Sequence, residues 1–387
     1  MKVLVAIDSF KGSISSIEAS RAISEGIQES YPDAEIIALP LADGGEGTVE
    51  ALLQATGGTK IERKVKGPLA AEKTAVYGIL DGGKTAVIEV AEACGLAFVS
   101  PEQRNPLLAT TYGVGELIAD AIGKGCRDFV IGLGGSATND GGTGMLQALG
   151  FRFLDGSGNE TGLGGQALKK IAGIDGSGAM PELMECNFRI ACDVNNVLYG
   201  PTGAAHIFGP QKGATPEMVE ELDEGLRHFA QIVLDQLGMD LQSIAGAGAA
   251  GGLGAAFSGF LRSEMESGID LIMDITDMEK KMQGADIVIT GEGRLDDQTA
   301  MGKAPLGVAR LAALHGIPAV ALAGAVSKDV GGLNRLGLTS CFSIINSPMA
   351  LDEAMNPEVA YSNLRRTASQ LFRLIRSVAV PAGNLQN

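Results

Sequence analysis

Glycine-rich loops placed directly after short apolar runs are the feature that most limits how this chain can fold. The clearest is GLGGSATNDGGTG, Gly132 to Gly144, which follows the apolar run 129–131 and precedes the apolar segment 145–149. This order predicts a strand, a tight turn and a helix, with a backbone bare enough for its N–H groups to approach an anion. The chain contains 55 glycines, about twice the usual share of ~7%. We therefore expect an α/β protein with a backbone-lined phosphate or nucleotide site.

Strands and helices alternate at both ends of the chain, whereas the middle has a different pattern. The first part predicts strands over 2–7 and 35–39, a helix over 49–55, and another helix opened by the capping box of Ser15 and Glu18. The alternation returns from Ala285, with strands expected over 286–290, 319–323 and 341–345 and helices over 306–315 and 357–378. The intervening segments 62–66, 73–80 and 85–90 are typical of antiparallel strands joined by tight turns, and Thr215 followed by Pro216 and Glu217 predicts the capped start of a later helix.

The fold predicted from this alternation is α/β. We expect a doubly wound, flavodoxin- or Rossmann-like parallel-sheet domain of residues 1–64 and 285–387, interrupted by an inserted mixed α/β domain of residues 65–284. Because 387 residues exceed the usual single core of about 250 to 300, two domains are the natural expectation. Ligands commonly bind between such domains, so we expect the active site in the cleft between them.

Composition excludes several classes of protein. The formal net charge of −16 argues against binding to nucleic acid or to an anionic membrane. No apolar run approaches the ~20 residues that a membrane span needs, and the polar start does not resemble a signal peptide, so we expect a cytoplasmic protein. Five scattered cysteines without a CxxC pattern indicate neither a zinc site nor a disulfide framework. Whether the protein is a monomer or a homodimer stays open.

Three glycine patterns match nucleotide-binding motifs formally. One of them, GxGxxG at Gly246–Gly251, follows no strand, so close helix packing is the better interpretation. The segment Gly78–Thr85 fits GxxxxGKT, but a β-branched run follows it where a P-loop would open a helix, so a hairpin turn is the better interpretation. The segment Gly132–Ala137 fits GxGxxA, with Asp155 at a suitable distance for a ribose-binding acid. This supports an alternative function, an NAD-dependent dehydrogenase of a small hydroxy acid. Against it, the polar turn 139–142 interrupts the place where the long Rossmann helix should begin.

Acidic residues and lysines gather in the loops after predicted strands. Open α/β sheets place their sites at these loops, and carboxylates with a few ammonium groups suit Mg²⁺ and phosphoryl transfer. The acids are Asp8, Asp43, Asp193, Glu292 and Asp296, and the lysines in glycine-bearing loops are Lys11, Lys212 and Lys303. No histidine accompanies a GxSxG nucleophile elbow, which disfavours a serine hydrolase.

With these loops assembled, the sequence strongly resembles the bacterial glycerate kinase family. The resemblance spans nearly the whole chain and is carried by AIDSFKGSISS, LPLADGGEGT, RNPLLATTYGVGELI, GLGGSATNDGGTG, GAAHIFGPQKGAT, GAGAAGGLGAA and ADIVITGEGRLDDQTAMGKAPLGVA. It implies a discontinuous two-domain α/β fold and an ATP- and Mg²⁺-dependent enzyme of glycerate and glyoxylate metabolism. The expected reaction phosphorylates D-glycerate on its 2-hydroxyl to give 2-phosphoglycerate, with the 3-hydroxyl as the open alternative.

Roles for individual residues follow from the resemblance. The nucleotide phosphates are expected at Gly134, Gly135, Ser136, Thr138, Asn139, Asp140, Lys212 and Lys303. Asp296 and Glu292 are the candidates for holding Mg²⁺, and Lys11 for neutralising the transferred phosphoryl group. Asp193 is the candidate base, although Asp8 and Asp193 could exchange roles, as could Asp43 and Asp296. Substrate contacts are expected from Ser9, Asp43, Arg104 and Arg294.

The third functional alternative is a non-catalytic metabolite sensor. Such a protein needs a partner or nucleic-acid surface, and the sequence offers neither a basic cluster nor an appended helix-turn-helix. The sequence thus favours a kinase whose partners are the small molecules ATP and D-glycerate.

Overall fold

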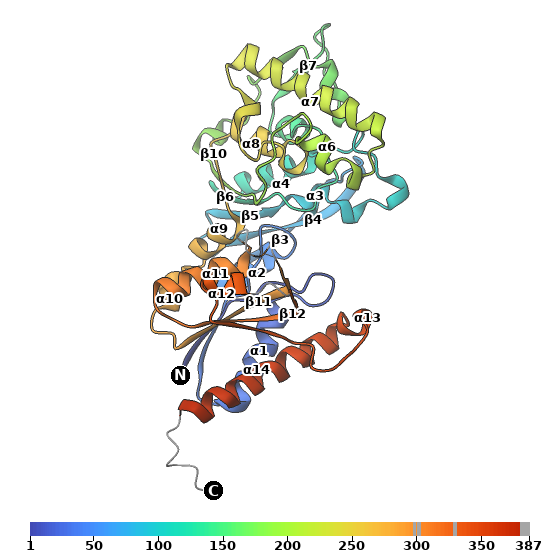
Figure 1. Cartoon of the computed structure of the whole chain (residues 1–387). Helices are drawn as coiled ribbons and strands as arrows, with labels where there is room; N and C mark the ends of the chain where they lie inside the picture. The colour runs from blue at the N-terminus through green and yellow to red at the C-terminus, as the bar shows by residue number, and fades with distance from the viewer. Residues whose placement is uncertain (297–298, 300–302, 328–330, 380–387) are drawn as a thin grey trace. The chain divides into compact units, whose positions relative to one another are not determined.

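The computed structural model describes residues 1–296, 299, 303–327 and 331–379 (Figure 1). Its contacts divide the chain into two compact units. Unit 1 comprises Met1–Asp43, Glu50–Thr56 and Ile269–Asn387, and unit 2 comprises Gly44–Val49 and Gly57–Gly268. Helix α2 (Thr48–Thr56) and helix α9 (Gly268–Ile275) each carry the chain from unit 2 into unit 1.

Unit 1 is built on a parallel sheet of five strands, as predicted. In the order β13-β12-β11-β1-β2 the strands are Ser340–Ser343, Ala319–Val326, Ile287–Leu295, Lys2–Val5 and Glu35–Ala38. The centre of the sheet joins distant parts of the chain, since Val3 pairs with Ile287 and Val5 with Ile289. Strand β11 is longer than expected and runs through Glu292 to Leu295, so this acid lies in the strand end and not in a following loop.

Helices cover both faces of the unit 1 sheet. Helix α1 (Ser16–Ser30) and helix α14 (Pro357–Ala379) pack together on the face that carries Val3 and Val5, and Figure 1 shows helix α11 (Ala304–Leu314) on the other side. The predicted capping box at Ser15 is present and starts α1. Each large apolar side chain buried here, such as Phe372, contributes about 1.5–3 kcal/mol. The shorter unit 1 helices are α10 (Met278–Met282), α12 (Gly331–Arg335) and α13 (Leu351–Ala354).

Unit 2 is built on a mixed sheet of six strands. In the order β10-β9-β6-β5-β4-β3 they are Ser263–Glu266, Asn187–Ala191, Asp128–Gly132, Thr85–Glu89, Glu72–Leu80 and Gly58–Lys66. The first four are mutually parallel, and β3, β4 and β5 form antiparallel pairs. The turn at Gly82 and Gly83, both with positive φ, joins β4 to β5, so the predicted hairpin is confirmed at the formal P-loop match.

The remaining elements of unit 2 surround its sheet and build one large core. The helices are α3 (Val90–Cys94), α4 (Tyr112–Gly123), α5 (Thr143–Ala148), α6 (Ala204–Phe208), α7 (Pro216–Leu237) and α8 (Leu253–Phe260), and a separate ribbon pairs β7 (Arg152–Leu154) with β8 (Gly173–Asp175). Helix α7 begins at its predicted cap, where the Thr215 hydroxyl accepts a hydrogen bond from the Met218 amide. No described helix is both long and apolar enough to cross a membrane.

The unit borders lie earlier in the chain than residues 64 and 285, which the strand pattern suggested. Strand β3 pairs with β4 from Gly58 to Lys66, so its whole length belongs with unit 2. At the other border, Ile269 already belongs to unit 1. The apolar residues Leu271 and Ile272 of α9 are fully buried, which gives this helix a place in a core before the next strand begins.

Candidate active site

The first group of predicted residues lies in unit 1, where strands β1 and β11 end side by side. The amide of Asp8 donates a hydrogen bond of 3.0 Å to the carbonyl of Gly291, which places the Asp8 carboxyl next to the strand that carries Glu292. Only 6% of Asp8 is exposed. Burial, followed by the negative charge of Asp43, raises its pKa from 3.8 to about 7, although the Ser9 amide donates to its Oδ1 at 2.6 Å and acts in the opposite direction.

An ion pair stands beside this carboxyl. The Lys11 ammonium lies 2.7 Å from Asp43 Oδ2, and the lysine side chain is otherwise largely exposed. Burial acts to lower the pKa of Lys11, but the charge of Asp43 and its hydrogen bond outweigh it, so the pKa is raised. Lys11 therefore stays protonated at neutral pH, next to a carboxyl that titrates there.

Glu292 and Asp296 are linked through one threonine. The Thr299 hydroxyl donates to Glu292 Oε1 at 2.6 Å and accepts a hydrogen bond of 3.1 Å from the Asp296 amide. Burial raises the pKa of Glu292, while the Thr299 bond and the charge of Lys303 oppose this shift. Arg294 lies 3.3 Å from Asp296 Oδ2 and is mostly exposed, so its charge is partly committed to that acid.

Unit 1 therefore has more negative than positive charge at this edge. Glu292 and Asp43 both act to raise the pKa of Asp8, whereas Lys11 acts to lower it. A divalent cation would relieve this excess, and Mg²⁺ commonly uses one or two carboxylates together with phosphate oxygens. Within the described ranges, no three acids, cysteines or histidines form a ready metal-binding group. The residues present thus suit a metal that arrives with a phosphate ligand.

The second group lies in unit 2 around the glycine-rich loop. The loop folds against the end of α3 and the residues after it: the Ala137 amide donates to the Cys94 carbonyl and the Leu96 amide to the Gly135 carbonyl, both at 2.8 Å. Gly134 and Gly135 are exposed. Among the described residues their amides find no hydrogen-bond acceptor. These two N–H groups are therefore available to an anion.

A second glycine turn packs against this loop. A Cβ atom at Gly132 would collide with the carbonyl of Gly44, and one at Gly134 would lie 3.1 Å from the Cα of Gly45. The two turns approach backbone to backbone, which explains why both contain glycine.

The rest of the predicted nucleotide loop is buried. Thr138, Asn139 and Asp140 have no exposed surface. The Asp140 carboxylate accepts hydrogen bonds from Thr111 (amide 2.8 Å, hydroxyl 2.9 Å) and from the amides of Gly142 (3.1 Å) and Gly144 (3.3 Å). These bonds tie the start of α5 to the start of α4. The acceptor positions of Asp140 are therefore directed at the protein itself.

Lys212 and Arg104 flank the loop, and Arg104 and Asn139 each have buried polar atoms without a hydrogen-bond partner among the described residues. The Lys212 ammonium donates to the Ser136 hydroxyl at 3.1 Å and to the Thr138 carbonyl at 2.7 Å. Arg104 donates from Nη1 to the Gln211 carbonyl at 3.4 Å, and its buried Nε has no partner among the described residues. The side-chain amide of Asn139 is likewise buried without a partner in the described part of the chain.

Asp193, a candidate base, is engaged with the backbone. Its Oδ1 accepts a hydrogen bond of 3.0 Å from the Gly268 amide, at the first residue of α9. Glu89 binds the start of α2 in the same way: its carboxylate accepts hydrogen bonds from the backbone amides of Val49 (2.8 Å) and Gly47 (3.3 Å). Sequence reasoning missed Glu89, because it ends a strand and belongs to no loop motif. Two acids at the ends of unit 2 strands thus hold the starts of the two helices that lead out of the unit.

The predicted site residues fall into these two groups. Unit 1 contains Asp8, Ser9, Lys11, Asp43, Glu292, Arg294, Asp296 and Lys303, and unit 2 contains Arg104, Gly134, Gly135, Ser136, Thr138, Asn139, Asp140, Asp193 and Lys212.

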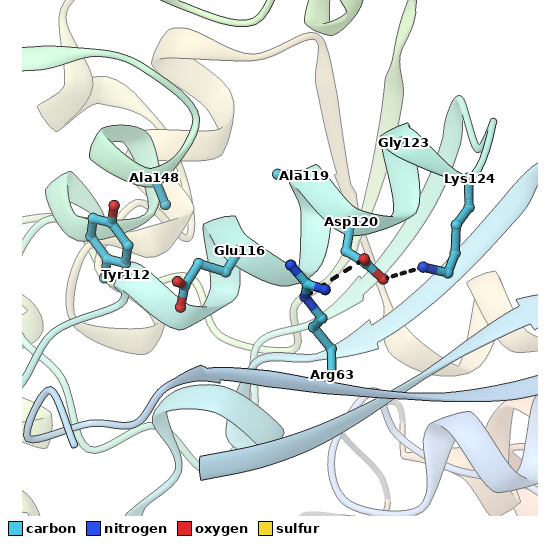
Figure 2. A pocket seen from close by; sticks show the side chains of 8 residues that line it. All are labelled: Arg63, Tyr112, Glu116, Ala119, Asp120, Gly123, Lys124 and Ala148. Carbon is cyan, nitrogen blue, oxygen red and sulfur yellow. Dashed lines mark hydrogen bonds and ion pairs between the residues drawn. The ribbon is translucent and has the colours of Figure 1, made fainter. Parts of the chain in front are cut away.

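A separate hollow of about 520 Å³ lies along α4 in unit 2 and includes none of the predicted site residues (Figure 2). Figure 2 shows Arg63 and Lys124 both directed at Asp120, at 3.6 and 2.8 Å. The buried Tyr77 hydroxyl also donates to this acid at 2.7 Å. Because its charged groups already satisfy one another, this hollow is not a candidate active site.

The glycine-rich loop does not support the dehydrogenase alternative. A dinucleotide fold needs a long helix opening near Ala137. The structure has an irregular segment there, and α5 covers only Thr143–Ala148.

Comparisons with known proteins agree with one family. The family model described as the glycerate kinase family matches residues 3–376. Glycerate kinase of Bacillus subtilis (strain 168) is 46% identical over 97% of this chain and 98% of that protein. Glycerate 2-kinase of Escherichia coli (strain K12) is 46% identical over 96% of this chain and 97% of its own length. A crystal structure from Salmonella typhimurium LT2, provisionally described as glycerate kinase 2, matches with a TM-score of 0.89 and 43% identity, covering 100% of both chains. The chain belongs to the glycerate kinase family.

Proposed function

We propose that this protein transfers the γ-phosphoryl group of ATP to D-glycerate, giving 2-phosphoglycerate and ADP. Membership of the glycerate kinase family supports the reaction, and the likeness to a glycerate 2-kinase supports the 2-hydroxyl as acceptor. The observation that carries the proposal is the unit 1 group, where a carboxyl with a pKa of about 7 lies among acids and a protonated lysine. Phosphoryl transfer needs few covalent steps from the protein, so a group that positions reactants and balances charge suits it.

Asp8 is the proposed base. Its pKa of about 7 lets it take the proton of the glycerate 2-hydroxyl near neutral pH, as a general base should. The hydroxyl oxygen then bonds to the γ-phosphorus while the bond from that phosphorus to the ADP oxygen breaks. Asp193 is the second candidate, and its Oδ1 accepts from the Gly268 amide, which ties this carboxylate to the start of α9.

Lys11 is proposed to neutralise the transferred phosphoryl group. Its long side chain is held only at its tip by Asp43, so the ammonium can turn to a phosphate oxygen that competes for it. Ser9 and Asp43 are proposed to contact glycerate.

Glu292 and Asp296 are the proposed Mg²⁺ carboxylates. Their shared Thr299 and the excess negative charge at this edge favour a cation there. When bound, Mg²⁺ neutralises the charge that develops on the phosphate oxygens. Lys303, the residue before α11, adds a positive charge near Glu292.

The exposed amides of Gly134 and Gly135 are proposed to bind ATP phosphates. Arg104 is proposed to hold the carboxylate of glycerate, since its buried Nε has no acceptor among the described residues whereas Arg294 is paired with Asp296. We further propose that the enzyme acts in the cytoplasm.

The test is ATP consumption by the purified protein with D-glycerate and Mg²⁺, with the phosphate position of the product assigned by ³¹P-coupled NMR. We expect 2-phosphoglycerate, and loss of turnover in Lys11→Ala but not in Lys170→Ala, which changes an exposed lysine of unit 2. A folded wild-type protein that consumes no ATP would overturn the proposal. A 3-phosphoglycerate product would overturn its assignment of the acceptor hydroxyl.

A further inference from the structure

Lys212 occupies a place that its glycine-bearing loop did not suggest. A phosphate contact is expected for this lysine, yet only 2% of Lys212 is exposed. It ends a short 3-10 turn, Pro210–Lys212, and the next residue, Gly213, has a φ of +89°. A Cβ atom at Gly213 would collide with Arg104, so the turn is pressed against that arginine. The backbone thereby directs the lysine into the unit and not outward.

The buried ammonium is bonded to the glycine-rich loop itself. It donates to the hydroxyl of Ser136, which directly follows the exposed pair Gly134 and Gly135, and to the carbonyl of Thr138, two residues further on. The same stretch is held from another side by the carbonyl of Cys94, the last residue of α3, and by the amide of Leu96 just beyond it. The loop is therefore fixed at both flanks while its two exposed amides keep no acceptor among the described residues.

The charge of Lys212 has no direct carboxylate partner in the described part of the chain. The titratable groups that face it are Cys94 from α3 and Asp140 from the loop. Burial raises the pKa of the Cys94 thiol to about 12, so this group stays neutral. The carboxylate of Asp140 is taken up by Thr111, Gly142 and Gly144. A buried ammonium in such surroundings is costly until an anion comes near, and burial lowers the pKa of Lys212 to about 8.

We propose that Lys212 is a positioning residue that holds the Ser136–Thr138 segment from inside unit 2, so that the amides of Gly134 and Gly135 are ready for a phosphate and its charge strengthens their attraction for it. Lys212 touches the loop, and the loop touches the anion. This inference rests on the proposed function for the identity of the natural ligand, ATP. The anion site itself can be tested without turnover.

The experiment is calorimetric titration with ATP and, separately, with inorganic triphosphate, in the absence of glycerate. Lys212→Met is compared with Lys170→Met, which removes an exposed lysine of the same unit. At pH 7.5 we expect Lys212→Met to bind each ligand roughly tenfold more weakly than the control, because the loop loses both hydrogen bonds that hold it and the positive charge behind it. At pH 9 the difference should shrink severalfold, because the wild-type ammonium then loses its proton. The ionisation of the ligand itself does not affect the ratio of the two affinities, because both variants bind the same ligand at the same pH.

Equal binding by the two variants at pH 7.5, within twofold, would overturn the inference. A tenfold difference that persists unchanged at pH 9 would also contradict it, because a purely structural role does not depend on the proton of the lysine.

If Lys212→Met does not fold, Ser136→Ala provides the second test: it removes one acceptor of the ammonium and keeps the lysine, and we expect a twofold to fivefold loss of triphosphate affinity. Failure of the proposed function is distinguishable, because the wild-type protein would then bind triphosphate with this lysine dependence and yet not phosphorylate D-glycerate.

Discussion

The two units place acids at the same kind of position, the carboxyl ends of parallel strands, and use them in opposite ways. In unit 2, Glu89, Asp140 and Asp193 all accept hydrogen bonds from backbone amides. In unit 1, Asp8 and Glu292 are crowded by other acids. Burial raises the pKa of both, as it does for Asp140 in unit 2, so what distinguishes the unit 1 acids is the negative charge beside them: Asp43 and Glu292 act on Asp8, and Asp296 acts on Glu292. The difference teaches that an acid after a strand is evidence of chemistry only when its neighbours leave its charge unsatisfied. A satisfied acid holds the backbone, whereas a crowded one is prepared to take a proton or a cation.

The largest effect should come from Asp8→Asn. The change keeps the size of the side chain and its acceptor for the Ser9 amide but removes the base, so we expect kcat to fall by at least about 100-fold. The melting temperature should stay the same or rise, because a buried carboxyl crowded by Asp43 and Glu292 is removed. Steady-state kinetics together with thermal unfolding measure both. Activity within threefold of wild type would show that Asp8 belongs with the structural acids.

Asp140→Asn should give the reverse pattern. An asparagine offers one acceptor oxygen where the carboxylate serves Thr111, Gly142 and Gly144, so buried amides lose partners. We expect the free energy of unfolding to fall by about 1–3 kcal/mol. Urea unfolding monitored by circular dichroism gives this value, with Asp235→Asn on the exposed side of α7 in the same unit as the control. An unchanged midpoint would remove Asp140 from the structural group.

The pH dependence of stability and of activity in the wild-type protein tests the role of Asp8. The Asp8 pKa of about 7 lies above its ordinary value of 3.8, so the folded protein binds more protons than the unfolded chain between these values. Its contribution to stability is therefore present at low pH and is lost as pH rises through 7, while kcat/KM rises over the same range as the carboxylate forms. Asp8→Asn should flatten that part of the stability profile. A rate profile with no acidic limb between pH 6 and 8 would argue against Asp8 as the base.

The smallest effect is expected for Glu89→Gln. One of its two amide partners, Gly47 or Val49, loses an acceptor, so the free energy of unfolding should fall by about 0.5–1.5 kcal/mol. Glu62→Gln on the exposed side of β3 serves as the control and should be neutral. Differential scanning calorimetry of the two variants measures this difference in stability. A loss of activity without a loss of stability would move Glu89 into the reactive group.

Local patterns predicted much of the fold. The capping box at Ser15 and Glu18 and the cap at Thr215 marked helix starts, because these signals need only residues three apart. The turn at Gly82 was recognised as a hairpin since β-branched residues follow it. The length of β11 was underestimated, because glycines within GEGR resemble the end of a strand although Arg294 and Leu295 continue the ladder with β12.

The candidate site was harder to predict, because the role of a side chain depends on what it faces. Sequence places Asp140 in a glycine-rich loop but not against Thr111, which is 29 residues away. It predicted a phosphate contact for Lys212 but not its burial, which follows from the turn at Gly213 and the contact of that turn with Arg104. Glu89 carries no motif at all. Residue type and spacing therefore located the loops, and tertiary contacts decided which of their polar groups are available.

The pairing of Val3 with Ile287 also has a consequence for how the protein is made. A ribosome delivers β1, α1 and β2 first, but their partner strand β11 and the covering helix α14 emerge only near the end of synthesis. Unit 2 is nearly continuous from Gly57 to Gly268, so it can complete its core while the early strands wait with apolar residues uncovered. We therefore expect the nascent chain to depend on chaperones through its first segment, and premature termination before α14 to leave a folded unit 2 joined to an unfinished unit 1.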